Sequence, residues 1–240
     1  MLNTILLQAT AAPVSGSTLM WVLFIALTLI SMLVSKNVER KFKKYKSIRT
    51  EGGLTGREVA EMMLRDHDIS NVQVCMVKGT LTDHYNPANR TLNLSPDVYN
   101  GTSVAAAAVA AHECGHAVQH KEGYAPLKLR SALVPAVNIS SKLSMIVIII
   151  GLLIINTFHA LFWVGIAMFA MVFLFSVVTL PVEFNASKRA LVWLKSSNSL
   201  GEKEAAQAKE ALGWAASTYV VAALSSLVTL LYYIGLGDRR

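Results

Sequence analysis

The 240-residue chain is 53% hydrophobic and only 15% charged, whereas about a quarter of the residues in an ordinary soluble domain are charged. This composition excludes an ordinary soluble globular protein and favours a membrane protein. The net charge is +7, yet no Lys or Arg precedes Lys36, so the positive charge is unevenly placed. The two cysteines, Cys75 and Cys114, do not suggest a disulfide framework.

The N-terminal part of the chain contains the first apolar run. Residues 1–18 carry no charged side chain and are expected to form an external segment, and residues 19–35 are long enough to cross a bilayer. Basic residues follow this run instead of preceding it, which indicates a retained anchor and not a cleaved signal peptide. Residues 36–49 contain seven Lys or Arg and one acid. The positive-inside rule places them in the cytoplasm, against anionic headgroups, and we expect no nucleic-acid partner.

Residues 36–130 have the composition of a small cytoplasmic domain. Thr55 and Glu58 fit a capping box that opens a helix. Residues 72–77 alternate as a strand, and we expect residues 91–94 to pair with them in a hairpin. A strand near a functional site can be purely structural or can bind an extended peptide as an added strand, and both readings stay open.

A metal-binding motif lies inside the most helix-favouring part of this domain. Residues 104–119 are rich in alanine, and residues 112–116 read HECGH. His112 and His116 are four residues apart and therefore project from the same helix face, where both imidazoles can reach one Zn²⁺ ion. Glu113 leans toward that side and is the expected general base for zinc-bound water. The alternative is a chance match between two surface histidines.

The second half of the chain contains three more apolar runs. Residues 131–157 and 160–181 are each long enough to span a bilayer, and the short connection between them makes them a hairpin. Residues 182–213 are more polar and return to the cytoplasmic face, before a last span at 215–235. Four spans return both termini to the outside.

A catalytic zinc site with two histidines needs a third ligand and an open position. The ligand must lie on the same membrane face as His112, which excludes His159 in the outer turn. Glu183 lies two residues after Pro181, at the cytoplasmic end of the third span. An acidic residue so close to hydrocarbon is costly unless it is paired or bound to metal, so Glu183 is the expected third ligand. Cys114 points to another side of the helix and is expected to pack, not to bind metal.

No spacing argument selects a residue that stabilises the oxyanion of the reaction. The candidates by sequence proximity or pattern are Arg189, His84, Tyr85 and His120.

The segments SPDVY, AAHECGHAVQH and LPVEFNASKRAL together resemble the YugP-type membrane zinc metallopeptidases, relatives of the HtpX heat-shock proteases and the CAAX prenyl proteases among the gluzincins. The resemblance implies zinc ligation by His112 and His116 and a general-base role for Glu113. It also places a ligand at Glu183, in agreement with the geometric argument. The chain has Asn185 and Ser187 where Asp is usual in the pattern, and both can still accept a hydrogen bond.

The sequence therefore predicts a mainly α integral membrane protein with four transmembrane helices and a small α+β zincin-like cytoplasmic metalloprotease domain. Its expected function is zinc-dependent endopeptidase activity on protein or peptide substrates at the membrane, with membrane protein quality control as the role that the HtpX resemblance implies. The alternative is a non-catalytic zinc-binding scaffold or adaptor. A homo-oligomer and a membrane regulatory partner both stay open, as do the substrate and the cleavage preference.

Overall fold

The computed structural model describes residues 16–238. Most of the expected external segment 1–18 and both terminal arginines lie outside the described residues.

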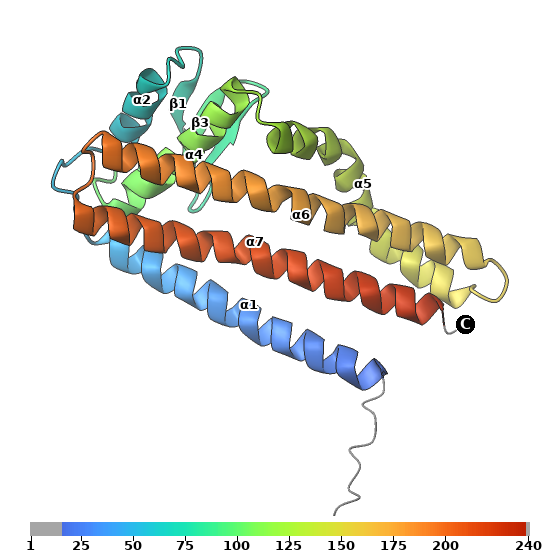
Figure 1. Ribbon diagram of the computed structural model, residues 1–240. Coiled ribbons are helices and arrows are strands. Elements are labelled where there is room, and N and C mark those ends of the chain that lie inside the picture. The colour runs from blue at the N-terminus through green and yellow to red at the C-terminus, as the bar shows by residue number, and fades with distance from the viewer. Residues whose placement is uncertain (1–15, 239–240) are drawn as a thin grey trace, which may run out of the picture.

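Four long helices dominate the described chain. They are α1 (Gly16–Lys46), α5 (Ala125–Leu153), α6 (His159–Ser196) and α7 (Glu202–Gly237). Each contains a stretch long and apolar enough to cross a membrane, which confirms the expected mainly α membrane fold with four spans. Figure 1 shows them as a row in which α6 packs against α5 and α7, and α1 packs against the other side of α7.

Helix α6 continues well beyond the expected span 160–181. Its 38 residues correspond to about 57 Å of helix, against about 30 Å of hydrocarbon. Pro181 lies inside α6 and does not end it, because membrane helices tolerate proline when neighbouring groups satisfy the freed backbone. Glu183 therefore lies on continuous helix and not in a loop after the span.

Glycines allow α5 and α6 to pack closely at the end of the molecule far from the small domain. A Cβ on Gly151 would lie 2.5 Å from the Phe162 nitrogen, and one on Gly165 would lie 2.7 Å from the Ile148 side chain. Without a hydrophobic driving force between helices in lipid, such close backbone approach is what favours their association.

The small domain lies between α1 and α5 in the chain. Its elements are α2 (Gly56–Asp66), β1 (Gln73–Met76), β2 (His84–Asn86), β3 (Thr91–Leu94), α3 (Pro96–Tyr99) and α4 (Val104–Lys121). The predicted capping box is present, with the Thr55 hydroxyl accepting from the Glu58 backbone and the Glu58 carboxylate accepting from the Thr55 backbone. The Ser103 hydroxyl caps α4 by accepting from the Ala106 N–H.

Residues 72–77 and 91–94 pair with each other as predicted, through β1 and β3, but the prediction that they form a hairpin is wrong. The sheet order is β1-β3-β2, and β1 pairs with β3 in parallel. The polar connection contains β2, a three-residue strand without an apolar alternation that could reveal it. The tight turn after β2 makes β2 and β3 the antiparallel pair, so β1 is left with the opposite edge of β3.

One hydrophobic core joins this domain to the ends of the long helices. Val59, Leu92 and Val118 from the domain are buried with Leu194 of α6 and Leu212 of α7 in one cluster. The domain is therefore not a separate unit on a linker, and helix α4 is fixed directly against α6.

Candidate active site

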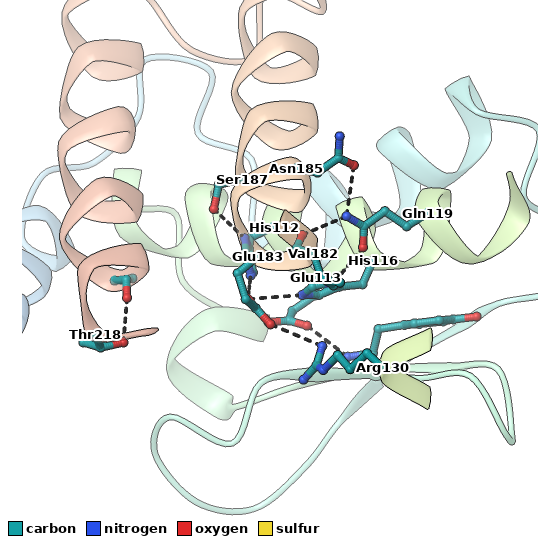
Figure 2. A network of polar contacts seen from close by, with 12 residues as sticks. His112, Glu113, His116, Gln119, Arg130, Val182, Glu183, Asn185, Ser187 and Thr218 are labelled. Carbon is teal, nitrogen blue, oxygen red and sulfur yellow. Dashed lines mark hydrogen bonds and ion pairs between the residues drawn. The ribbon is translucent and has the colours of Figure 1, made fainter. Parts of the chain in front are cut away.

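His112 and His116 of α4 meet Glu183 of α6 (Figure 2). Glu183 Oε2 lies 3.3 Å from His112 Nε2 and 3.6 Å from His116 Nε2. One ligand atom from each of the three residues lies within 4.8 Å of the other two, and His116 and Glu183 are buried. Among the described residues this is the one His, Cys, Asp and Glu cluster able to hold a metal ion.

Gly115 is the residue that lets α4 approach α6 closely enough to form this cluster. A Cβ at Gly115 would lie 2.6 Å from the Ala186 carbonyl oxygen and 3.0 Å from its Cα. Both are backbone atoms, so neither can rotate away. Ala186 is three residues after Glu183, which places the carboxylate on the adjoining face of α6, beside both histidines.

The three residues fit a zinc ion. Ligand atoms at about 2.0–2.1 Å in a tetrahedron around zinc lie roughly 3.4 Å apart, close to the 3.3 Å and 3.6 Å between Glu183 Oε2 and the two imidazole nitrogens. Glu183 Oε2 is also buried and has no hydrogen-bond partner of acceptable geometry. A buried carboxylate oxygen without a donor is costly, and a metal ion in this position would satisfy it.

The second nitrogen of each imidazole has a hydrogen-bond partner. Ser187 Oγ lies 3.1 Å from His112 Nδ1, and Gln119 Oε1 lies 3.1 Å from His116 Nδ1. With Nδ1 protonated and donating to these oxygens, each Nε2 presents its lone pair toward Glu183 and is ready to bind a metal.

Gln119 connects His116 to a wider set of polar contacts. Its Nε2 donates to the Val182 carbonyl at 2.8 Å and to Asn185 Oδ1 at 3.0 Å. Asn185 Oδ1 also accepts from Arg189 Nε at 2.7 Å. The Arg189 guanidinium in turn donates two hydrogen bonds to the Glu122 carboxylate, which holds the pKa of Glu122 below its usual value.

Glu113 is held beside the cluster by the sheet. The residue is only 9% exposed, and its Oε2 accepts a hydrogen bond of 3.0 Å from the Tyr85 backbone N–H in β2. This contact fixes the carboxylate next to the two histidines, where it can accept a proton from a water molecule in the same cavity.

A cavity of about 300 Å³ opens onto the cluster. One wall comes from the β2 segment and carries polar groups of Asp83, His84 and Tyr85. The opposite wall comes from the long helices and is more apolar, with Leu127, Val134, Phe175 and Tyr219 among its residues. The arrangement can therefore take a chain segment with polar backbone on one side and apolar groups on the other.

The oxyanion candidates from the sequence separate into two groups. His84 and Tyr85 line the cavity. Arg189 does not, because its guanidinium is paired with Glu122. His120 lies outside the cavity lining as well, with its Nδ1 at 2.7 Å from the Tyr85 hydroxyl. Cys114 is fully buried and its Sγ contacts the Ala60 carbonyl, and burial raises the pKa of this thiol well above its usual value.

The sequence analysis did not select Gln119 or Arg130. Gln119 follows His116 by three residues on the same helix, so helical spacing could have indicated the contact. Arg130 lies on α5, and its Nη1 is 3.3 Å from Glu183 Oε1. No spacing rule in the sequence relates residues on different helices that meet only in the folded chain.

Comparison with known proteins identifies the family. The sequence model of a family described as "Putative neutral zinc metallopeptidase" matches residues 20–237. The chain is also similar to "Putative membrane protease YugP" of Bacillus subtilis (strain 168), with 40% identity over 216 residues that cover 88% of this chain and 95% of the relative. No solved structure matches the chain. The chain therefore belongs to this family of neutral zinc metallopeptidases, as a multi-pass membrane protein with Zn²⁺ as its metal.

Proposed function

We propose that the protein is a membrane-embedded zinc endopeptidase in which His112, His116 and Glu183 bind the metal and Glu113 is the general base. The observation that supports this most strongly is Glu183 Oε2, a buried carboxylate oxygen without a hydrogen-bond donor that faces two imidazole nitrogens. A structural zinc would need a fourth protein ligand, and among the described residues no further His, Cys, Asp or Glu joins the cluster.

Zinc held by these residues supplies the Lewis acidity that activates water and polarises a peptide carbonyl. Glu113 takes the proton from the attacking water and delivers it to the leaving amine. The Tyr85 N–H keeps the Glu113 carboxylate in place for both transfers. His84 and Tyr85 border the cavity and are the sequence candidates that remain for binding the substrate carbonyl.

We propose that the site faces the cytoplasm. Figure 1 shows the small domain at the end of the long helices where α1 finishes, and the α5–α6 turn at the opposite end. The basic residues at the end of α1 therefore lie on the same side as the zinc cluster, and the positive-inside rule assigns that side to the cytoplasm. In this arrangement residues 19–35, 131–157, 160–181 and 215–235 cross the bilayer, and 36–130 and 182–213 form the water-side part.

The proposed substrates are membrane-associated proteins. The cavity lies where the small domain meets α5, α6 and α7, so a substrate segment at the membrane surface can reach it. Within residues 16–238, strand β2 pairs with β3 alone and borders the cavity, which gives an extended substrate an edge to lie along. The resemblance to the HtpX proteases suggests misfolded membrane proteins as the biological targets.

The test compares the wild-type protein with Glu113→Gln. The zinc content and the cleavage of an unstructured, membrane-tethered peptide are measured in the same preparations. Glutamine keeps the shape of the side chain and leaves the ligands unchanged. We expect one zinc per chain in both proteins, and a loss of cleavage of about 10²–10⁴-fold in the variant. Glu61→Gln is the matched control, because Glu61 lies on α2 outside this cavity.

Each outcome has a distinct meaning. Wild-type protein without zinc would contradict the metal site. Equal cleavage by the wild type and Glu113→Gln would contradict the general-base assignment. Zinc in both proteins with no cleavage of any tethered peptide by the wild type would favour the scaffold alternative.

A further inference from the structure

Arg130 is a cationic side chain in the cavity wall that the mechanism above does not use. It lies in the first part of α5, and Figure 2 shows its guanidinium beside the Glu183 carboxylate. Arg130 Nη1 donates to Glu183 Oε1 at 3.3 Å, a long but charge-assisted hydrogen bond. The guanidinium carbon also lies 6.0 Å from the centre of the Phe175 ring, within the range of a cation–π contact.

The two oxygens of Glu183 have different surroundings. Oε2 faces the imidazoles of His112 and His116 and has no donor. Oε1 contacts Arg130, with 3.3 Å to Nη1. One oxygen of the carboxylate therefore faces the proposed metal position and the other contacts a permanent cation, since an arginine is charged at every physiological pH.

The packing of α5 against α6 fixes this contact. The two helices are antiparallel, and Gly165 of α6 packs directly on Ile148 of α5. Eighteen residues further along α6 is Glu183, and eighteen residues back along α5 is Arg130. Helix α5 contains Pro135 between these two positions and bends in Figure 1, so the equal spacing brings the arginine only to the level of the carboxylate, and the 3.3 Å contact between Nη1 and Oε1 shows that the two groups meet.

We propose that Arg130 is a positioning residue that holds Glu183 Oε1, so that Glu183 offers only Oε2 to the metal. This inference rests on the ligands proposed above. Carboxylates bind metal ions through one oxygen or through both, and a catalytic zinc site needs one position free for water. By occupying Oε1, Arg130 prevents Glu183 from taking a second coordination position.

An arginine suits this role for two physical reasons. Glu183 is only 3% exposed, and a buried carboxylate needs a compensating charge or full hydrogen bonding. The Phe175 ring also supports the guanidinium from one side, which reduces the number of orientations that the side chain can adopt. An arginine that instead bound the substrate would not need to contact a metal ligand.

The test replaces zinc with Co²⁺, whose visible absorption weakens as its coordination number rises. The full-length protein in detergent is compared with Arg130→Leu and Arg130→Met, which both remove the donors, and with Arg130→Lys, which keeps a charge and a donor. Methionine retains an unbranched stem that can pack on Phe175, so one of the two donor-free variants suffices if the other does not fold. Lys128→Gln is the matched control, because it removes a positive charge from the same helix outside the cavity lining.

We expect the visible absorption of the Co²⁺ protein to weaken in Arg130→Leu and Arg130→Met, and kcat of the zinc forms to fall about 10- to 100-fold with KM nearly unchanged. Arg130→Lys should recover part of the Co²⁺ absorption and part of kcat, and Lys128→Gln should match the wild type in both. An unchanged Co²⁺ spectrum in the donor-free variants would overturn the proposal. In that case a raised KM would indicate substrate binding, and a lower kcat would indicate direct contact with the reacting carbonyl.

The spectrum separates this inference from the proposed function. A wild-type protein that binds Co²⁺ but cleaves no peptide would contradict the peptidase, while a changed spectrum in Arg130→Leu would still support the positioning role. A wild-type protein that binds no Co²⁺ would contradict the ligand set and the positioning role with it.

Discussion

His112 and His116 come from the same helix and face the same carboxylate, but their surroundings differ. The Nδ1 atom of His112 contacts the hydroxyl of Ser187, a small group that can rotate. The Nδ1 atom of His116 contacts the Gln119 amide, which is itself held by the Val182 carbonyl and the Asn185 side chain. One imidazole is therefore supported by one hydroxyl, and the other by an amide with two further hydrogen bonds.

This difference shows how strongly the site depends on α6. Helix α4 supplies both imidazoles, whereas Glu183, Ser187 and the two groups that accept hydrogen bonds from Gln119 all belong to α6. The distance and rotation of α6 relative to α4 thus set the position of the third residue and the orientation of both rings. Changes that move α6 should affect both histidines, and changes at Gln119 or Ser187 should affect one.

The largest effect is expected from Gly115→Ala, which disturbs both histidines together. The added Cβ would lie 2.6 Å from the Ala186 carbonyl oxygen, so α6 must shift. We expect a loss of about 1–3 kcal/mol in the free energy of unfolding and less than one zinc per chain. Gly213→Ala on α7 is the control, because no atom lies within 4 Å of its added Cβ. Alanine there should keep the zinc and, by helix propensity, stabilise slightly. Full zinc occupancy in Gly115→Ala would show that the two helices are not fixed at this crossing.

Gln119→Leu tests the more extensively supported histidine. Leucine has a similar volume but leaves His116 Nδ1 and the buried Val182 carbonyl without their partner. Loss of such a partner typically weakens metal binding about 10- to 100-fold, which a competition titration with a chelating dye can measure. Gln119→Glu keeps the acceptor for His116 and loses the donor to Val182. We expect Gln119→Glu to bind zinc more tightly than Gln119→Leu. Equal weakening of zinc binding in both variants would contradict the role of Gln119 Oε1 as the acceptor for His116.

The sequence was sufficient to predict the metal-binding helix because its signals are local. HECGH lies on one helix face, its alanine-rich surroundings favour helix, and the apolar runs have the length of a bilayer. Glu183 was predicted from its place at the end of a span, and the structure brings it to the two histidines. The packing role of Gly115 was not predicted, since the sequence does not show that α6 crosses α4 at this point.

The features that the sequence did not reveal depend on contacts between distant segments. Arg130 meets Glu183 only because α5 and α6 pack in one particular register. The parallel pairing of β1 with β3 depends on β2, whose three polar residues give no strand signal. Local patterns thus predicted the long helices and most elements of the small domain, whereas β2, the order of the strands and the cation beside Glu183 required the tertiary structure.

Ser187 variants test the histidine with the simpler support. Ser187→Ala removes one neutral hydrogen bond from His112, worth about 1 kcal/mol, so we expect zinc affinity to fall about fivefold. Ser187→Asp provides a carboxylate partner for the same Nδ1 and should bind zinc more tightly than the wild type. The dye competition used for Gln119 measures both. If Ser187→Ala lost as much zinc affinity as Gln119→Leu, the two histidines would not differ in how strongly their hydrogen-bond partners support metal binding.

The smallest effect is expected from Arg189→Gln. Arg189 and Glu122 are the most distant members of the polar contacts that begin at His116, and the variant breaks the ion pair between them. Arg189 holds the pKa of Glu122 below its usual value of 4.5. A carboxyl with a lowered pKa stabilises the folded state above its unfolded pKa, and this stabilisation is lost as the pH falls through the folded pKa.

We therefore expect Arg189→Gln to lose roughly 0.2–1 kcal/mol of the free energy of unfolding at pH 7, because the pair is partly exposed. The difference from the wild type should disappear in acid, below the pKa of Glu122 in the folded protein. Thermal unfolding in detergent across this pH range measures it. A loss that stayed constant with pH would show that Arg189 acts through Asn185 alone, and not through its ion pair with Glu122.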